Sequence, residues 1–295
     1  MAVAPASLLA GKRTAHLELV EPLPLAPGLD SDRRDPNADR STPRLLEIGG
    51  AALPKKVHAK KVAVVTGGNR GMGLETCRQL AREGFTVVLT SRDAKAGKAA
   101  ALALRGEGLD VVHQRLDVTN PRSASSLAGF IRHTYGRADV LVNNAGAIFE
   151  DIAQQDRLLD VSASVLKETL DVNTHGPIQV ARALIGIMKE RGEGNIINVS
   201  SELAAPDQLS EPGAPAYRLS KAILELATKM LAAELEGSGI SVNAVVPGWV
   251  QTAMGGPNAP LTVEEGVDTT VWLAMRPKEE RVSGGLFRDR VRTCD

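Results

Sequence analysis

Cysteine is scarce in this sequence: Cys77 and Cys294 are the only two in 295 residues, and they lie far apart in the chain. Two such distant cysteines argue against a disulfide framework and favour a reducing compartment. No CxxC motif and no cluster of cysteine with histidine occurs. The sequence therefore predicts no zinc site or other metal site.

Neither sign of charge is in excess, because 35 basic residues balance 35 acidic ones. The sequence therefore predicts neither a nucleic-acid partner nor binding to a membrane surface. Long hydrophobic runs are also missing, and no apolar stretch is long enough to cross a bilayer. With an ordinary apolar fraction of 43%, these absences favour a globular protein that we expect to be cytoplasmic.

The first 57 residues differ from the rest in composition. Residues 1–60 hold seven of the sixteen prolines, together with a run of mixed charge at 30–44 and little periodicity. We expect residues 1–57 to be a disordered or loosely attached extension. A transit peptide is the alternative, because the first 17 residues contain no acid; the acids that begin at Glu18 and the scarcity of arginine favour a tail without targeting.

From residue 58 to residue 295, short apolar runs alternate with helical patterns. The expected strands lie at 61–68, 85–91, 110–119, 138–146, 194–201 and 240–248. Helices are expected between them, the longest at 216–239 and another from about Val161 to Asn173 and beyond. Because the strands are continuously apolar, the pattern predicts a parallel sheet covered on both faces. We expect one doubly wound α/β domain of the Rossmann type.

A glycine-rich segment, TGGNRGMG, joins the first expected strand to the first helix at residues 66–73. Glycine lets the backbone turn tightly and approach a pyrophosphate, while the following helix offers free N–H groups and the positive end of its dipole. The strand–turn–helix context favours a dinucleotide site over an ordinary turn. The residues expected to bind the cofactor here are Gly67, Asn69, Arg70, Gly71, Met72 and Gly73.

The end of the second expected strand indicates which dinucleotide is bound. An acid there typically binds the ribose 2′-hydroxyl of NAD, whereas arginine accommodates the 2′-phosphate of NADP. Here Thr90 and Ser91 end the strand and Arg92 follows, with Arg70 able to close on the same phosphate. Asp93 is the complication, and we interpret it as the N-cap of the next helix. The sequence therefore predicts NADPH or NADP⁺.

The longest expected helix places one of the two tyrosines, Tyr217, four residues before Lys221. Residues at this spacing share a helix face, so a phenol would lie beside an ammonium group. The pair is either an ordinary surface pair or an acid–base device. In the second case, Lys221 would favour phenolate and pull the phenol pKa down from about 10 toward working pH.

Three motifs together carry a family resemblance: TGxxxGxG at Thr66–Gly73, NNAG at Asn143–Gly146 and YxxxK at Tyr217–Lys221. In order and spacing they resemble the single-domain short-chain dehydrogenase/reductase family over about residues 60–290. The segments at 248–274 and 283–290 are similar to the carbonyl-reductase branch. The resemblance implies reduction of an aldehyde or ketone with NADPH, and a small-molecule carbonyl substrate.

The resemblance also implies catalytic roles. Tyr217 would be the general acid, and Lys221 would hold the nicotinamide ribose and tune the phenol. Ser201 would polarise the substrate carbonyl, and Ser200 is the alternative, which we interpret as a strand-end hydroxyl. Asn173 would kink its helix and hold a water that links Lys221 to solvent; the alternative is a helix-terminating asparagine before a Gly-Pro pair.

Further cofactor contacts are implied at three places. Asp117 and Val118 would read the adenine, and Asn144 and Gly146 would line the floor of the cofactor site. Trp249 is either a pocket aromatic or a buried loop tryptophan. The segment that would hold the nicotinamide carboxamide contributes Pro247, Gly248, Val250 and Thr252.

Segment 202–215, between Ser201 and Tyr217, is slightly longer than in the family, and it borders the expected pocket. We expect it to shape specificity. The chain lacks the long insertion that blocks helix–helix association in some relatives, which leaves a homodimer or homotetramer open. Two alternatives for the activity also remain: an NADP-dependent secondary-alcohol dehydrogenase, and a non-catalytic dinucleotide sensor on the same fold.

Overall fold

The computed structural model describes residues 60–150, 157–208 and 212–293. The predicted extension and its boundary at residue 57 lie outside these residues. In the described part, eight strands form one sheet in the order β3-β2-β1-β4-β5-β6-β7-β8, parallel except for β8. The strands are β1 (Val62–Val65), β2 (Thr86–Ser91), β3 (Val111–Arg115), β4 (Val140–Asn143), β5 (Gly194–Val199), β6 (Ile240–Val245), β7 (Leu286–Arg288) and β8 (Val291–Arg292).

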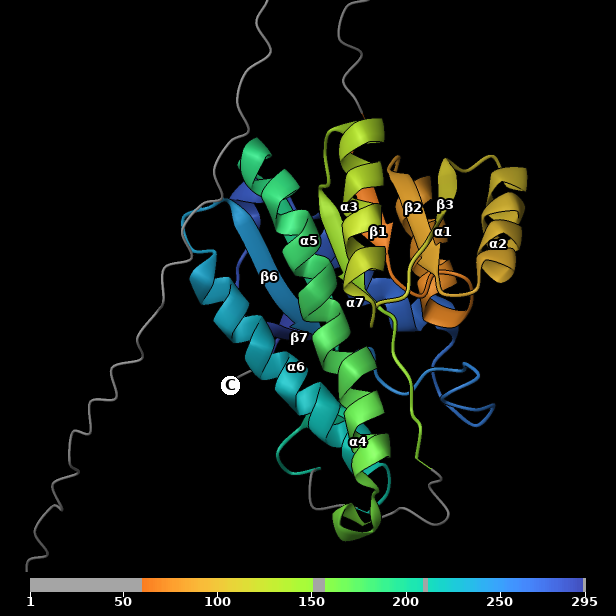
Figure 1. Ribbon diagram of the computed structural model, residues 1–295, viewed down its shortest axis with the longest axis vertical. Coiled ribbons are helices and arrows are strands. Elements are labelled where there is room, and N and C mark those ends of the chain that lie inside the picture. The colour runs from red at the N-terminus through yellow and green to blue at the C-terminus, as the bar shows by residue number, and fades with distance from the viewer. Residues whose placement is uncertain (1–59, 151–156, 209–211, 294–295) are drawn as a thin grey trace, which may run out of the picture. The chain divides into compact units, whose positions relative to one another are not determined.

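Helices cover both faces of the sheet, as the apolar strands predict. Side chains of α3, α5 and α6 pack on one face, and those of α1, α2 and α7 pack on the other. Figure 1 shows the first group in front of the sheet. The helices are α1 (Gly71–Arg82), α2 (Ala94–Gly106), α3 (Pro121–Tyr135), α4 (Ala163–Leu170), α5 (Gly176–Arg191), α6 (Pro215–Glu234) and α7 (Val263–Met275). The doubly wound α/β fold is thereby confirmed.

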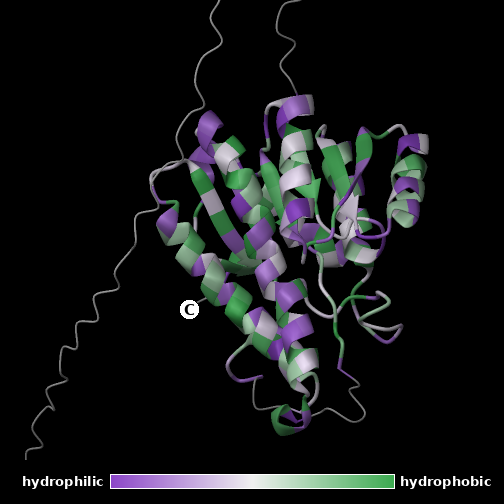
Figure 2. Cartoon of the chain, viewed as in Figure 1, coloured by the Kyte–Doolittle hydropathy of each residue, from purple (hydrophilic) through white to green (hydrophobic). Residues whose placement is uncertain are grey.

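Local signals in the sequence set many helix boundaries. The Asn120 side chain accepts hydrogen bonds from two N–H groups of the first turn of α3, Pro121 follows, and Gly136 ends the helix at φ +63°. Thr262 and Glu265 form a reciprocal capping box at the start of α7. Between these ends the strands are mostly hydrophobic and the helices alternate hydrophobic with hydrophilic residues (Figure 2), so each helix can bury one face on the sheet.

Two features differ from the sequence expectation. Strands β7 and β8 were not predicted, because three-residue and two-residue strands carry too little pattern to detect. The helix expected from about Val161 to Asn173 and beyond does continue past Asn173, but not as a regular α-helix. Instead α4 runs into α5 through a π turn at Asp171–His175, which accommodates the extra backbone before Pro177. The helix-terminating interpretation of Asn173 is therefore wrong.

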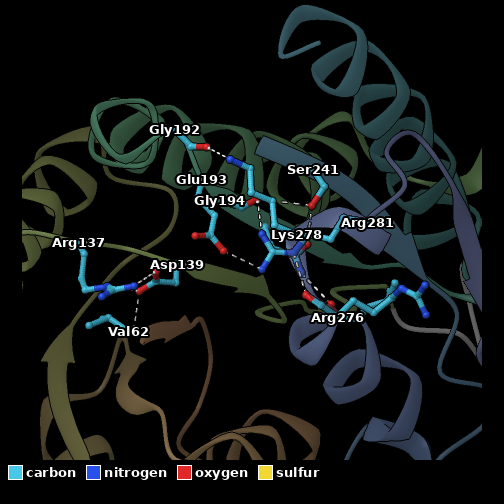
Figure 3. A network of polar contacts seen from close by, with 12 residues as sticks. Val62, Arg137, Asp139, Gly192, Glu193, Gly194, Ser241, Arg276, Lys278 and Arg281 are labelled. Carbon is cyan, nitrogen blue, oxygen red and sulfur yellow. Dashed lines mark hydrogen bonds and ion pairs between the residues drawn. The ribbon is translucent and has the colours of Figure 1, made fainter. Parts of the chain in front are cut away.

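A buried ion pair joins the amino ends of β1 and β4. Oδ2 of Asp139 accepts hydrogen bonds from the Val62 N–H at 2.7 Å and from Nε of Arg137 at 2.7 Å, and Oδ1 accepts one from Nη2 of Arg137 at 2.5 Å. Figure 3 shows the three residues together. The carboxylate thus satisfies a buried backbone donor as well as a partly buried guanidinium.

Asp139→Asn is expected to lower the free energy of unfolding by about 2–3 kcal/mol, because Arg137 would lose this carboxylate and the Val62 N–H its charged acceptor. Chemical denaturation measures the change. Lys60→Met is the matched control, since Lys60 and Asp110 form an exposed pair at 3.1 Å, expected to contribute less than about 1 kcal/mol. Equal effects of the two substitutions would contradict this account of Asp139.

Candidate active site

The candidate site lies at the carboxyl ends of the parallel strands. β1 pairs with β2 on one side and β4 on the other, so the strand order reverses there, which is where doubly wound sheets bind ligands. A cavity of about 1110 Å³ opens at this edge. Every residue expected to bind the cofactor lines it, and so do Ser201 and Ser200. Asn173 does not line the cavity.

The glycine turn at one end of the cavity is tightly built. Gly67 and Gly71 adopt φ values of +64° and +53°, where a side chain would be strained. A Cβ added to Gly73 would lie 2.3 Å from the carbonyl oxygen of Gly67. The Asn144 side-chain amide donates to the carbonyls of Thr66 and Gly67 at 2.9 and 3.3 Å, which holds the turn against β4. The glycine turn and the first residues of α1 thus line the cavity together, as a pyrophosphate site requires.

The residues expected to select NADP lie around the same end. Arg70 and Arg92 are exposed and line the cavity, and neither guanidinium hydrogen-bonds to another described residue. Asp93 caps α2: one of its oxygens accepts from the N–H groups of Lys95 and Ala96 at 2.8 and 3.1 Å, and these bonds lower its pKa. The N-cap interpretation of Asp93 is confirmed.

At the opposite end, Ser201, Tyr217 and Lys221 converge. The Ser201 hydroxyl lies close enough to the Tyr217 phenol to lower the pKa of the phenol. Lys221 is 3% exposed, its Nζ donates to the Val199 carbonyl at 2.7 Å and lies 5.7 Å from the centre of the Tyr217 ring. Ser200 instead donates to Glu225 at 2.5 Å, so it is the strand-end hydroxyl that the sequence predicted.

Burial dominates the titration of this pair. It lowers the pKa of Lys221 to about 8, with Glu225 opposing the shift, and it raises the pKa of Tyr217, opposed by the Ser201 hydrogen bond. The sequence led us to expect that Lys221 would lower the phenol pKa, but burial outweighs the lowering influences and the net shift of the pKa is upward. The ammonium binds the Val199 carbonyl and lies beside the ring. Tyr217 is therefore a neutral phenol at pH 7, as a proton donor must be.

Asn173 lies behind the cavity, within the π turn. Its Oδ1 accepts from the Ala147 N–H, and its Nδ2 donates to the Ala147 carbonyl and to Oγ of Ser220, at 2.8, 2.8 and 3.0 Å. A Cβ on Gly146 would lie 3.4 Å from Oδ1 of Asn173 and 3.5 Å from Nζ of Lys221. Asn173 thus fixes both the loop after β4 and the residue preceding Lys221. Its expected role in holding a water stays a prediction.

The segment after β6 also lines the cavity. A Cβ on Gly71 would lie 3.5 Å from Cγ2 of Thr252, so this segment lies next to the glycine turn. Trp249 is 49% exposed, lines the cavity and donates through Nε1 to the Gly255 carbonyl at 2.7 Å. It is a pocket residue, and the alternative of a buried loop tryptophan is wrong.

Glu150 contributes to the site in a way that the sequence did not reveal. Its Oε1 accepts from the N–H groups of Ala216 and Tyr217 at 2.6 and 3.3 Å, so it caps α6 from 66 residues away. Its Oε2 is buried and has no hydrogen-bond partner among the described residues. No local signal marks such a cap, because Glu150 follows a strand and is distant in sequence from the helix it caps.

The described residues contain no group of histidine, cysteine, aspartate and glutamate able to hold a metal ion. None of the helices among these described residues has both the length and the apolar character needed to span a membrane.

Comparisons with known proteins agree with this geometry. Residues 61–260 match the short chain dehydrogenase family. The chain is similar to (+)-neomenthol dehydrogenase of Arabidopsis thaliana, 34% identical over 285 residues that cover 77% of this chain and 95% of the relative. It is also similar to carbonyl reductase (NADPH) 3 of Rattus norvegicus, 35% identical over 275 residues that cover 78% of this chain and 97% of the relative. A solved variant of actinorhodin polyketide ketoreductase with NADPH has a TM-score of 0.69 and 26% identity, covering 77% of this chain and 94% of that one.

The family match spans more than half of the chain, and the relatives cover more than two thirds of it. The fold is the one that the glycine turn and the parallel strands predicted. This protein belongs to the short chain dehydrogenase family of oxidoreductases.

Proposed function

We propose that the protein is an NADPH-dependent reductase of aldehydes or ketones. One observation carries the proposal: Ser201 and Tyr217 line one cavity with their hydroxyls close enough to interact, and the same cavity is lined by the glycine turn and by Arg70 and Arg92, whose guanidinium groups have no hydrogen-bond partner among the described residues. A hydroxyl pair of this kind can hold a carbonyl oxygen, while the turn holds a dinucleotide. The names of the rat relative and of the ketoreductase structure, both printed with NADPH, support the choice of cofactor.

The residues present fit NADPH. Glycine at position 73 keeps the turn tight, since a Cβ there would collide with the Gly67 carbonyl, and a tight glycine turn before a helix lets a pyrophosphate approach the N-terminus of α1. Arg70 and Arg92 would hold the 2′-phosphate. Asp117 and Val118 line the cavity where the adenine would lie. When bound, the cofactor supplies a hydride to the carbonyl carbon of the substrate.

Side chains of the protein bind the carbonyl oxygen of the substrate and donate the proton that it receives. Ser201 donates a hydrogen bond to the carbonyl oxygen and thereby polarises it. Tyr217, a neutral phenol because burial raises its pKa, donates its proton to the same oxygen as negative charge develops there. The ammonium of Lys221, fixed on the Val199 carbonyl, stabilises the phenolate that remains. Asn173 holds this arrangement in place through Ser220.

The substrate end of the cavity is apolar. Its walls beyond the hydroxyl pair include Ile148, Phe149, Leu203, Ala214 and Met254. The acid there is Glu202, whose carboxylate lies 3.5 Å from the guanidinium of Arg288. An apolar aldehyde or ketone fits these walls, whereas a sugar or a carboxylic acid would leave polar groups without partners.

NADPH oxidation with a panel of apolar aldehydes, cyclic ketones and quinones tests the proposal, with sugars and keto acids as negative controls. We expect turnover with at least one apolar carbonyl. NADPH binding without any turnover, together with no oxidation of secondary alcohols by NADP⁺, would support the alternative of a dinucleotide sensor. Turnover confined to alcohols and NADP⁺ would support the dehydrogenase.

Arg92→Asp is expected to lower kcat/KM for NADPH by about a hundredfold, since each charge-assisted hydrogen bond contributes about 1.5–3 kcal/mol. Use of NADH should be spared or improved, because the introduced acid can bind a ribose hydroxyl. Kinetics with both cofactors measure the ratio. Arg105→Asp, at the far end of α2, makes the same charge change and should leave the ratio unchanged. An unchanged ratio in Arg92→Asp would contradict the NADP assignment.

A further inference from the structure

Arg218, the residue after Tyr217, is an arginine buried in an unusual way. It is 7% exposed, and its guanidinium donates to three backbone carbonyls: Nε to Gly213 at 2.6 Å, Nη1 to Gln208 at 2.6 Å and Nη2 to Pro212 at 3.0 Å. A planar guanidinium has five donors in a fixed geometry and can satisfy several carbonyls at once. Arg218 therefore ties three points of the segment between Ser201 and Tyr217 to the catalytic helix.

That segment forms one wall of the substrate end of the cavity. Leu203 and Ala214 line the cavity, one near each end of the segment. Ala214 adopts φ +50°, a left-handed conformation that costs a residue with a Cβ about 1 kcal/mol or more. The strain persists because Arg218 holds the preceding Gly213 carbonyl, while the Arg218 N–H donates to the Ala214 carbonyl at 2.9 Å.

We propose that Arg218 is a positioning residue that fixes the wall formed by residues 202–208 and 212–214, and so selects bulky apolar carbonyls over small ones. The inference rests on the proposed function and names a specificity determinant within it. Arg218 does not line the cavity, so it acts on the substrate only through this wall. Because the wall is already ordered before substrate binds, a bulky substrate that contacts the wall does not bear the entropic cost of ordering it. A small aldehyde that reaches only the two hydroxyls does not contact the wall and gains no affinity from its order.

Arg218→Met removes all three donors and keeps an apolar stem, and Arg218→Lys keeps part of the hydrogen bonding. With 4-tert-butylcyclohexanone as the bulky probe, we expect Arg218→Met to raise KM about tenfold with kcat within about threefold. With propanal, kcat/KM should stay within about threefold, and the Kd for NADPH within about twofold. Arg218→Lys should fall between the wild type and Arg218→Met.

Arg281 offers a matched control at the other end of the sheet. Its side chain is 5% exposed, and it donates to the carbonyls of Arg276 and Gly194 and pairs with Glu193 (Figure 3). Gly194 begins β5, whereas Ser201 lies just beyond the end of that strand. Arg281→Met should lower Tm and leave the ratio of the two probes unchanged. Equal losses on both probes in Arg218→Met, or no loss on either, would overturn the proposal.

Hydrogen exchange separates this proposal from the proposed function. Amides of residues 202–208 and 212–214 should exchange faster in Arg218→Met than in the wild type, with the peptides of β1 and α1 unchanged. Wild-type protein that reduces neither probe nor any carbonyl of the panel would contradict the proposed function and remove the specificity claim with it. Unchanged exchange in residues 202–208 and 212–214 would overturn the positioning role of Arg218, whatever the activity.

Discussion

Replacing Tyr217 with phenylalanine is expected to lower the rate of carbonyl reduction by about two to four orders of magnitude. The change removes one oxygen, which is both the proton donor and the partner of the Ser201 hydroxyl. The ring stays, so the packing against Lys221 and the cavity wall is kept. We therefore expect the Kd for NADPH to stay within about twofold and the loss to fall on kcat. Single-turnover kinetics with saturating NADPH measure it.

The chain supplies its own control, because its only other tyrosine is Tyr135. Tyr135 lies on α3, with its ring 5.9 Å from that of Phe130, and burial also raises its pKa. Tyr135→Phe should leave reduction unchanged. A Tyr217→Phe variant that keeps more than about a tenth of the activity would mean that another group delivers the proton, and the assignment of the general acid would be wrong.

Lys221→Met is expected to have the second largest effect, a loss of about two orders of magnitude, because no charge would remain to stabilise the phenolate of Tyr217. In the wild type, the dependence of the rate on this charge should also appear as a dependence of the rate on pH. Burial lowers the pKa of Lys221 to about 8, so the ammonium is present below that pH and is lost as the pH rises through it. The rate of reduction should therefore be nearly flat below pH 8 and fall above it.

A pH profile of kcat/KM tests whether the rate of reduction falls above pH 8. Lys221→Arg, whose guanidinium does not titrate in this range, should flatten the fall above pH 8 if it keeps activity. Lys189→Met, an exposed lysine on α5, should reproduce the wild-type profile. A wild-type rate that rises through pH 8 would contradict the role of the ammonium group.

Much of the fold follows from local sequence. The run VAVV before TGGNRGMG predicts a buried strand and a phosphate turn without tertiary information, because neighbouring residues fix both. Tyr217 and Lys221 could likewise be paired by their helical spacing. The π turn was harder to foresee, since Asn173 and Thr174 are held by Ser220, 46 or more residues away.

Other parts of the site depend on tertiary contacts that no local sequence pattern indicates. Arg218 reads as an ordinary helix residue, and its function appears only when Gln208, Pro212 and Gly213 fold around it. The direction of the phenol pKa shift was mispredicted for a related reason, because spacing alone does not reveal how deeply Tyr217 is buried. Helical spacing brings the two side chains to one face, but the Val199 carbonyl decides where the ammonium group lies. The homo-oligomer and the cytoplasmic location remain predictions.

The most direct test of the central claim follows the two hydrogens of the product. Wild-type protein and Tyr217→Phe are each incubated with NADPH doubly deuterated at C4 and an apolar ketone, and the alcohol is analysed by mass spectrometry. The account predicts one deuterium on the carbinol carbon with the wild type, and almost no alcohol with Tyr217→Phe although it binds the cofactor. Unlabelled alcohol, no alcohol from the wild type with any carbonyl, or equal yields from the two proteins would contradict it.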